Sequence, residues 1–151
     1  MPRHQAVLVG LVLLVSYAYF YQAGGWNQNS RFDLVRALIE RGTPRIDAYE
    51  TNTGDKAVVE GHTYTDKAPG QSLTALPPVA LGEVILRAAG RDVGGAAEQS
   101  LLSYVATIWA AGLPTVAAAL CLAWTARCLG SSAGGAGFVA LVYGLATPAW
   151  A

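Results

Sequence analysis

Four apolar stretches dominate the pattern of hydrophobic and polar positions along this chain. They cover residues 6–22, 71–89, 101–126 and 134–151, and each is nearly free of charge. A helix needs about 20 predominantly apolar residues to cross about 30 Å of membrane hydrocarbon. The pattern therefore predicts an all-α integral membrane protein with about four transmembrane helices, the fourth of which is expected to be truncated.

The first stretch admits two interpretations. It follows Arg3 and ends in aromatic residues, including Tyr17, Tyr19 and Trp26. Such aromatic residues are typical of the membrane interface. A cleaved signal peptide also has a basic start and a short apolar core, but the bulky residues that follow provide no clear small-residue cleavage site. We therefore expect an uncleaved span, with a signal peptide as the alternative.

The second stretch contains residues that are unusual inside a membrane. Pro77 and Pro78 lie in its first half, and Glu83 lies in its second half. Glu83 and Arg87 are four residues apart, so they share a helix face and can form an ion pair. We favour an interfacial ion pair over a proton relay for this acid. In the third stretch, Pro114 predicts a kink.

The charge distribution points to one working region. The chain is 53% hydrophobic and 13% charged with zero net charge, whereas a soluble domain carries about 25% charge. The apolar content excludes a disordered chain, and the charge balance argues against a nucleic-acid partner. Of the 20 charged residues, 13 lie between positions 31 and 67. We expect the chemistry of the chain in the loop that this region forms, residues 23–70.

The basic residues of the short segments predict the orientation. Arg3, Arg87 and Arg91 fall on one side of the four predicted spans, against a lone Arg127 on the other. Because positive charge accumulates on the cytoplasmic side, the N-terminus is expected in the cytoplasm. The loop 23–70 would then be periplasmic, on the outer face of a bacterial inner membrane.

A surface helix is predicted within this loop, at about residues 31–42. Ser30 is a suitable N-cap, Asp33 completes a capping-box pattern, and Gly42 is a suitable end. The apolar residues between them recur at helical spacing, at Phe32, Val35, Leu38 and Ile39. An amphipathic helix of this kind is expected to lie flat on the membrane with its apolar face down.

Asp33 is the first candidate for chemistry in this helix. Arg36 lies three residues after Asp33 and four before Glu40, so it could reach both acids and hold a carboxylate ionised and aimed. The simpler interpretation is that Asp33 only caps the helix and complements its positive end. Spacing alone leaves both interpretations open.

The two lysines of the chain share a sequence context. Both occur as Asp-Lys-Ala, at Asp55-Lys56-Ala57 and at Asp66-Lys67-Ala68. A compact ammonium group beside a carboxylate is suited to binding phosphate, although two occurrences can arise by chance. A rigid Pro-Gly turn follows Lys67, and it is expected to hold Asp66 and Lys67 at the depth of lipid phosphates.

No cofactor is required by the sequence. His62 could join nearby acids in binding a divalent metal, but no spacing is diagnostic of a metal site, and a single loop histidine is more often only hydrogen-bonded. No metal ligand is therefore assigned, and a divalent metal stays an open alternative.

Several of these features together resemble a known family. They are the apolar first span, Asp33 in a surface helix with Arg36, and the run Tyr64-Thr65-Asp66-Lys67-Ala68-Pro69-Gly70 at the entry to the second span. Over residues 6–78 the chain resembles the N-terminal part of GT-C glycosyltransferases. It is most similar to the branch of protein O-mannosyltransferases and lipid A aminoarabinose transferases.

The resemblance implies an activity and site roles. Such enzymes transfer a sugar from a polyprenyl-phosphate donor to an acceptor hydroxyl on the outer face of the membrane. It implies Asp33 and Asp66 as catalytic residues, with Asp33 as general base or acceptor-positioning carboxylate. Lys67 and Lys56 would bind the donor phosphate, and Arg36 would support the site. The partners would be the lipid-linked sugar, membrane lipid and an unidentified acceptor.

The family has many more spans than the four predicted here, so the chain is expected to be an N-terminal fragment that is inactive alone. Two other functions are consistent with the same sequence. One is a small non-catalytic membrane protein whose charged loop docks a partner. The other is a transporter subunit, for which ionisable residues at mid-membrane would be expected. Only Glu83 and Pro114 favour the transporter.

Overall fold

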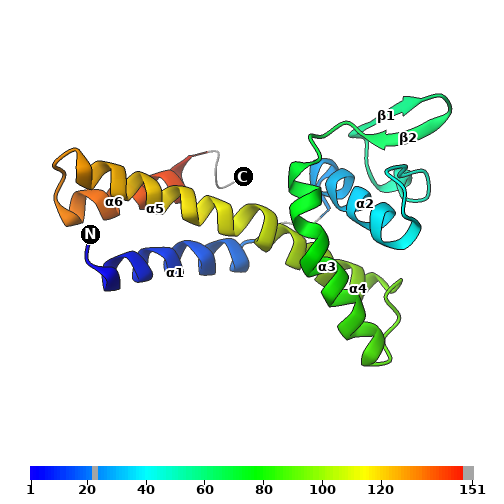
Figure 1. The fold of residues 1–151 in the computed structure, drawn as a ribbon, viewed down its shortest axis with the longest axis horizontal. Helices are drawn as coiled ribbons and strands as arrows, with labels where there is room; N and C mark the ends of the chain where they lie inside the picture. Colours follow the sequence, from blue (N-terminus) through cyan, green and yellow to red (C-terminus); the bar gives the residue numbers. More distant parts are fainter. Residues whose placement is uncertain (22–23, 148–151) are drawn as a thin grey trace. The chain divides into compact units, whose positions relative to one another are not determined.

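The computed structural model describes residues 1–21 and 24–147, which are mostly helical with one short hairpin (Figure 1). The chain divides into two compact units. The first unit comprises Met1–Tyr21 and Ala111–Ala151, and the second comprises Gln22–Ala110. The predicted helical class is therefore confirmed, apart from the hairpin.

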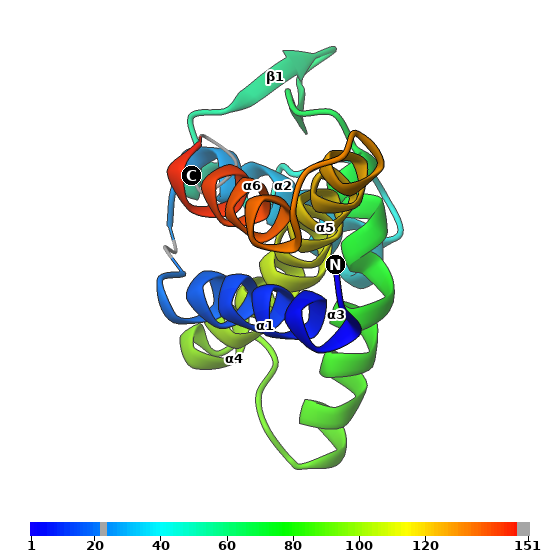
Figure 2. The same cartoon turned by 90° about the vertical axis from the view of Figure 1, so that its left-hand side faces the viewer.

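The first unit contains α1 (Arg3–Tyr19), α5 (Leu113–Cys128) and α6 (Ala133–Ala146), which pack together (Figure 2). Alanines form much of its buried interior, which comprises Val9, Leu13, Val116, Ala119, Ala123, Ala136 and Ala140. Its exposed surface carries large apolar side chains, among them Leu8, Leu11, Val15, Trp124 and Phe138. Small residues inside and large apolar residues outside are typical of helices that pack within a membrane.

Gly144 allows α6 to approach α1 closely. A Cβ atom added at this glycine would lie 2.5 Å from Cδ2 of Leu13. The Tyr17 hydroxyl donates a hydrogen bond to the Gly144 carbonyl at 2.8 Å. A larger residue at position 144 would therefore push the two helices apart.

The second unit contains α2 (Trp26–Arg41), the short 3-10 helix η1 (Glu50–Asn52), β1 (Lys56–Val59), β2 (His62–Thr65), α3 (Gly70–Ala88) and α4 (Ala96–Thr107). One face of α2 packs against α3 and α4. Phe32, Val35 and Ile39 from that face join a cluster with residues such as Val79 and Leu102. The predicted contact of this face with membrane is therefore wrong, because neighbouring helices cover it.

The start of α2 also differs from the prediction. The helix begins five residues earlier than expected, at Trp26, and the Gly25 amide donates to the Gln28 side chain at 3.0 Å. Ser30 and Asp33 are thus interior helix residues, and the predicted capping role of both is wrong. The predicted end is confirmed, because Gly42 follows the helix with a left-handed φ of 63°, which suits glycine.

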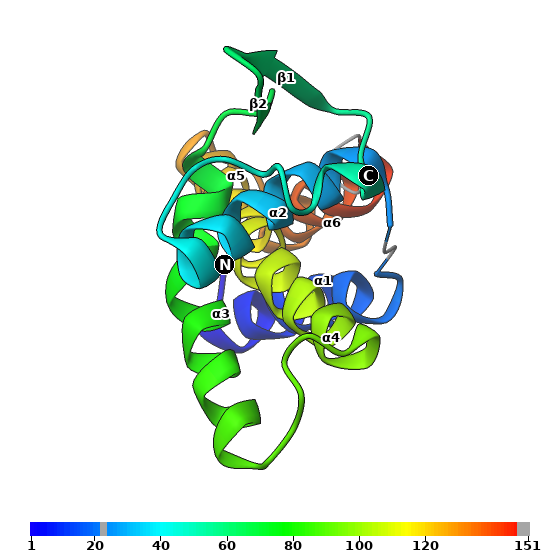
Figure 3. The same ribbon diagram turned by 90° about the vertical axis from the view of Figure 1, so that its right-hand side faces the viewer.

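The hairpin was not predicted. β1 and β2 pair antiparallel with Lys56 opposite Thr65 and Val59 opposite His62 (Figure 3). The two turn residues have positive φ angles, 51° at Glu60 and 80° at Gly61, as in a type I′ turn. Glu-Gly is not among the preferred pairs for this turn, so the sequence signal for the hairpin is weak.

Within the described residues, one helical run is long and apolar enough to cross a membrane. It extends over Ala96–Cys128 and joins α4, the π-helix η2 (Ile108–Gly112) and α5. The π turn ends two residues before Pro114, where a kink was predicted. The apolar helices α1 and α6 are shorter, and residues 22 and 148–151 of the predicted spans lie outside the described part. Four spans are therefore not established by the helix lengths.

The helix α3 continues through Pro77 and Pro78. Its buried Glu83 pairs with Arg87 at 3.0 Å, so the predicted ion pair is present.

Candidate active site

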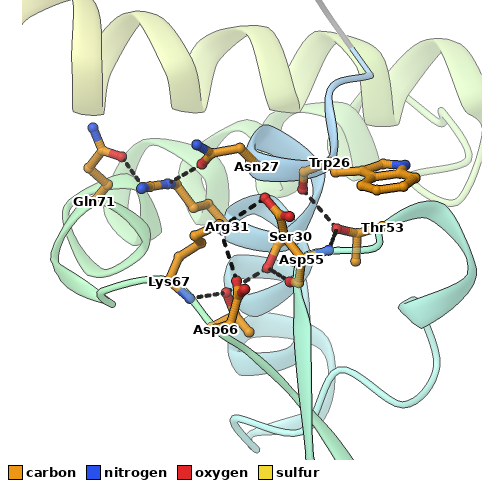
Figure 4. Close-up of polar contacts among 10 residues, drawn as sticks. Trp26, Asn27, Ser30, Arg31, Thr53, Asp55, Asp66, Lys67 and Gln71 are labelled. Carbon is orange, nitrogen blue, oxygen red and sulfur yellow. Dashed lines mark hydrogen bonds and ion pairs between the residues drawn. The ribbon is translucent and has the colours of Figure 1, made fainter.

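The first half of α2 meets the two ends of the hairpin, and Asp33, Asp66 and Lys67 belong to this region, whereas Lys56 and Arg36 have partners elsewhere. Ser30 on α2 is fully buried, and its hydroxyl donates to the Asp55 carbonyl at 2.5 Å. The same hydroxyl lies 2.6 Å from the Thr65 hydroxyl. Because Asp55 precedes β1 and Thr65 ends β2, one serine ties both strands to the helix (Figure 4).

The segment between η1 and β1 is fixed to the same helix by two further bonds. The Asn29 amide group donates to the Asn52 carbonyl at 2.7 Å. The Thr53 hydroxyl donates to the Trp26 carbonyl at 2.8 Å. These bonds hold segment 52–55 along the first half of α2.

Asp33 is fully buried beneath this segment. Its Oδ1 accepts a hydrogen bond from the Asn52 side chain at 3.1 Å. Its Oδ2 has no hydrogen-bond partner among the described residues. Burial raises the pKa of Asp33 to about 6, against the opposing effects of the Asn52 hydrogen bond and the Arg36 charge. The carboxyl can therefore exchange a proton near neutral pH.

Arg36 binds one of the two acids that were expected. It pairs with Glu40 at 3.0 Å and lies 4.2 Å from the centre of the Tyr49 ring. The Tyr49 hydroxyl donates to Glu40 at 2.8 Å. The ion pairs of the described residues do not join Arg36 to Asp33, so the expected double contact is wrong. Arg36 affects Asp33 through its charge alone.

Lys67 lies between two carboxylates. Its Nζ is 2.9 Å from Oδ2 of Asp55 and 3.2 Å from Oδ1 of Asp66 (Figure 4). Hydrogen bonds to both acids raise the pKa of Lys67, so the ammonium form is stabilised. Asp66 was the expected partner. Asp55 was not, because only the hairpin pairing brings it beside Lys67.

Lys56 is used differently, despite the shared Asp-Lys-Ala pattern. Its Nζ donates to the Glu50 carbonyl at 2.8 Å and lies 3.6 Å from Oε2 of the same residue. The two lysines therefore have different acidic partners, and the structure does not bring Lys56 into the cluster around Lys67.

Two acids hold the hairpin to the preceding loop. Asp47 accepts from the Thr63 amide at 2.6 Å and lies 3.0 Å from Nδ1 of His62. Glu50 accepts from the Thr63 hydroxyl at 2.5 Å. The Thr63 bonds are the main cause of a lowered pKa at both Asp47 and Glu50. The described residues include no group of three potential metal ligands, and His62 is engaged by Asp47.

Arg31 is a residue of this region that the sequence pattern does not single out. Its Nε donates to the Asn27 side chain at 2.9 Å, and its Nη1 donates to the Gln71 side chain. Its carbonyl accepts from the Ser72 hydroxyl at 2.9 Å. Arg31 thus links α2 to the start of α3. The available signal was its position in the predicted surface helix, two residues before Asp33.

Comparison with known proteins finds no match for this chain. The chain matches no protein-family model, no curated protein and no solved structure.

Proposed function

We propose that this chain forms the donor-side part of a membrane glycosyltransferase of the GT-C kind. The donor would be a sugar linked to a polyprenyl phosphate, and the acceptor would be a hydroxyl group on the outer face of the membrane. The observation that carries the proposal is Asp33, a fully buried carboxyl with one unpartnered oxygen and a pKa of about 6. Such a group is suited to general base catalysis.

In the proposed reaction, the acceptor oxygen attacks the anomeric carbon of the sugar. The bond between that carbon and the phosphate oxygen breaks, and the lipid phosphate leaves with the electron pair. Asp33 takes the proton of the attacking hydroxyl, and cationic side chains stabilise the charge on the phosphate. A single displacement inverts the anomeric centre. Because Asn52 covers Asp33, segment 52–55 must shift for the acceptor to reach it.

Lys67 would keep its expected role at the donor phosphate, whereas Asp66 would support Lys67 instead of acting as the catalytic residue that the resemblance implies. The ammonium group of Lys67 is stabilised by its two acids, and it would interact with the donor as a point charge. Asp66 would keep Lys67 in place rather than touch the reacting atoms. Lys56 would act only through the hairpin, since Glu50 holds it.

The membrane part of the proposal is supported by the exposed surface of the first unit. Helices α1, α5 and α6 expose large apolar side chains over an interior rich in alanine, as expected for helices surrounded by lipid. In the second unit, α3 exposes Leu73, Leu81, Val84 and Ile85. We propose that α1, α3, the run Ala96–Cys128 and α6 are the four spans of an inner-membrane protein.

The test is sugar transfer by the natural protein that contains this chain, supplied with a polyprenyl-phosphate sugar and membrane acceptors. Asp33→Asn removes the base and keeps the side-chain shape, so transfer is expected to fall at least about 100-fold. Asp92→Asn is the control, because Asp92 is an exposed acid at the turn before α4. Undiminished transfer in correctly folded Asp33→Asn protein would reject the proposal.

A further inference from the structure

The charged side chains of the site differ in how far acids neutralise them. Lys67 lies between Asp55 and Asp66, and Lys56 is held by Glu50. Arg36 is likewise paired with Glu40. Arg31 is held by neutral side-chain amides instead, and the ion pairs of the described residues give it no acidic partner. Its positive charge is therefore uncompensated by any contacting carboxylate.

The guanidinium of Arg31 also retains free donors. An arginine has five N–H donors in a planar fork. Two of them are directed at Asn27 and Gln71, which leaves three in the described structure. A planar set of donors matches the oxygens of a phosphate group and can bind it with two parallel hydrogen bonds.

The position of this guanidinium is fixed from two sides. Asn27 lies one turn earlier on α2, and Gln71 lies in the first turn of α3. The Ser72 hydroxyl holds the backbone carbonyl of Arg31 at 2.9 Å. Because the side chain is already ordered, binding an anion would cost little further conformational entropy.

The surroundings favour a lipid-linked phosphate over a free one. Leu81 and Ile85 on α3 are more than half exposed. At about 100° per residue, both lie on the same side of the helix as Gln71. An apolar chain attached to the phosphate could follow these side chains along α3.

We propose that Arg31 binds the phosphate group of a polyprenyl-phosphate ligand, with its isoprenoid chain along the exposed apolar side of α3. This inference rests on the proposed function and assigns the phosphate contact to a residue that the sequence pattern did not select. Lys67 would add a second charge to the phosphate site, partly neutralised because it is shared between Asp55 and Asp66.

The experiment measures binding of a polyprenyl monophosphate to the purified full-length protein in nanodiscs. Arg31→Gln is expected to weaken binding at least about tenfold, as expected when a charge-assisted hydrogen bond is lost. Arg31→Lys keeps the charge without the planar fork and is expected to weaken binding by a smaller factor. Arg45→Gln is the matched control, because Arg45 is an exposed arginine in the same loop, and it should leave the affinity unchanged.

Two further ligands identify the source of the phosphate. Inorganic phosphate and vesicles of phosphatidylglycerol should compete weakly, whereas the polyprenyl monophosphate should compete strongly. Equal competition by inorganic phosphate would overturn the assignment to a lipid-linked ligand. If Arg31→Gln does not fold, unchanged affinity in Arg31→Lys overturns the phosphate contact.

The outcome separates this inference from the proposed function. Transfer that requires Asp33, combined with unchanged affinity in Arg31→Gln, overturns the inference alone. Weakened binding in Arg31→Gln, combined with Asp33-independent transfer, supports the phosphate contact and rejects the proposed catalytic role.

Discussion

At the scale of single residues, Asp33 combines two properties that oppose each other. Its full burial makes ionisation unfavourable, and the Asn52 bond and the Arg36 charge make it more favourable. Burial has the larger effect, so the pKa is raised to about 6 from an ordinary 3.8. A carboxyl group contributes little to the stability of the fold in this environment, because an uncharged side chain avoids the cost of burying charge.

The raised pKa of Asp33 predicts a pH-dependent loss of stability. Between pH 4 and 6 the folded protein holds the proton more tightly than the unfolded chain, so the free energy of unfolding decreases as the pH rises through this range. Ionisation of buried Asp33 lowers the free energy of unfolding by on the order of 2 kcal/mol, from about 1.4 kcal/mol per pKa unit with an allowance for solvent screening. Asp33→Asn should remove this cost.

The measurement is chemical denaturation of both proteins at pH 4 and pH 7. The difference in stability between Asp33→Asn and the natural protein should move in favour of the variant as the pH rises. Asp47 and Glu50 have lowered pKa values, so their contribution to the stability of the protein is lost as the pH falls. Because both proteins contain these two acids, the difference between them isolates Asp33. A pH-independent difference would contradict the raised pKa.

At the scale of elements, the sequence pattern predicted the end of α2 but not its start. Gly42 provides a clear stop signal. The start was placed at Ser30 because serine favours N-caps. In the structure, Gly25 and Gln28 provide the cap. Ser30 then bonds to Asp55 and Thr65, which are distant in sequence, so its role depended on tertiary structure that local patterns do not reveal.

The hairpin turn predicts a stabilising substitution. Glu60 has a positive φ of 51°, which is strained for a glutamate and well tolerated by asparagine. Glu60→Asn is expected to stabilise the hairpin by about 0.5–1 kcal/mol. Hydrogen exchange of residues 56–65 measures this effect, and Glu60→Gln serves as a control that keeps the strain. Equal protection in both variants would show that the turn conformation is not the cause.

At the scale of the whole molecule, composition indicated a helical protein, and four apolar stretches indicated its main helices. The division into two compact units was not predicted. The sequence pattern located 13 charged residues in one loop, but it did not predict which of them form ion pairs. Asp55 meets Lys67 because β1 and β2 pair, and Arg31 meets Gln71 because α2 packs beside α3. Such contacts depend on the fold, not on spacing.

The proposed arrangement in the membrane predicts which positions are accessible from outside. In a background with both natural cysteines changed to serine, Glu60→Cys should react with a membrane-impermeant maleimide added to intact cells. Asp92→Cys should react only after the membrane is permeabilised, because it lies in the connection expected on the cytoplasmic side. Labelling of Asp92→Cys in intact cells would contradict the proposed orientation.

The central claim is that the buried carboxyl of Asp33 is the catalytic base, and the pH dependence of sugar transfer tests it most directly. The rate should rise with pH through a midpoint near 6, where Asp33 loses its proton. Because the Asn52 hydrogen bond lowers the pKa of Asp33, Asn52→Ala should move that midpoint to higher pH. A midpoint that is the same in the natural protein and in Asn52→Ala would contradict the claim.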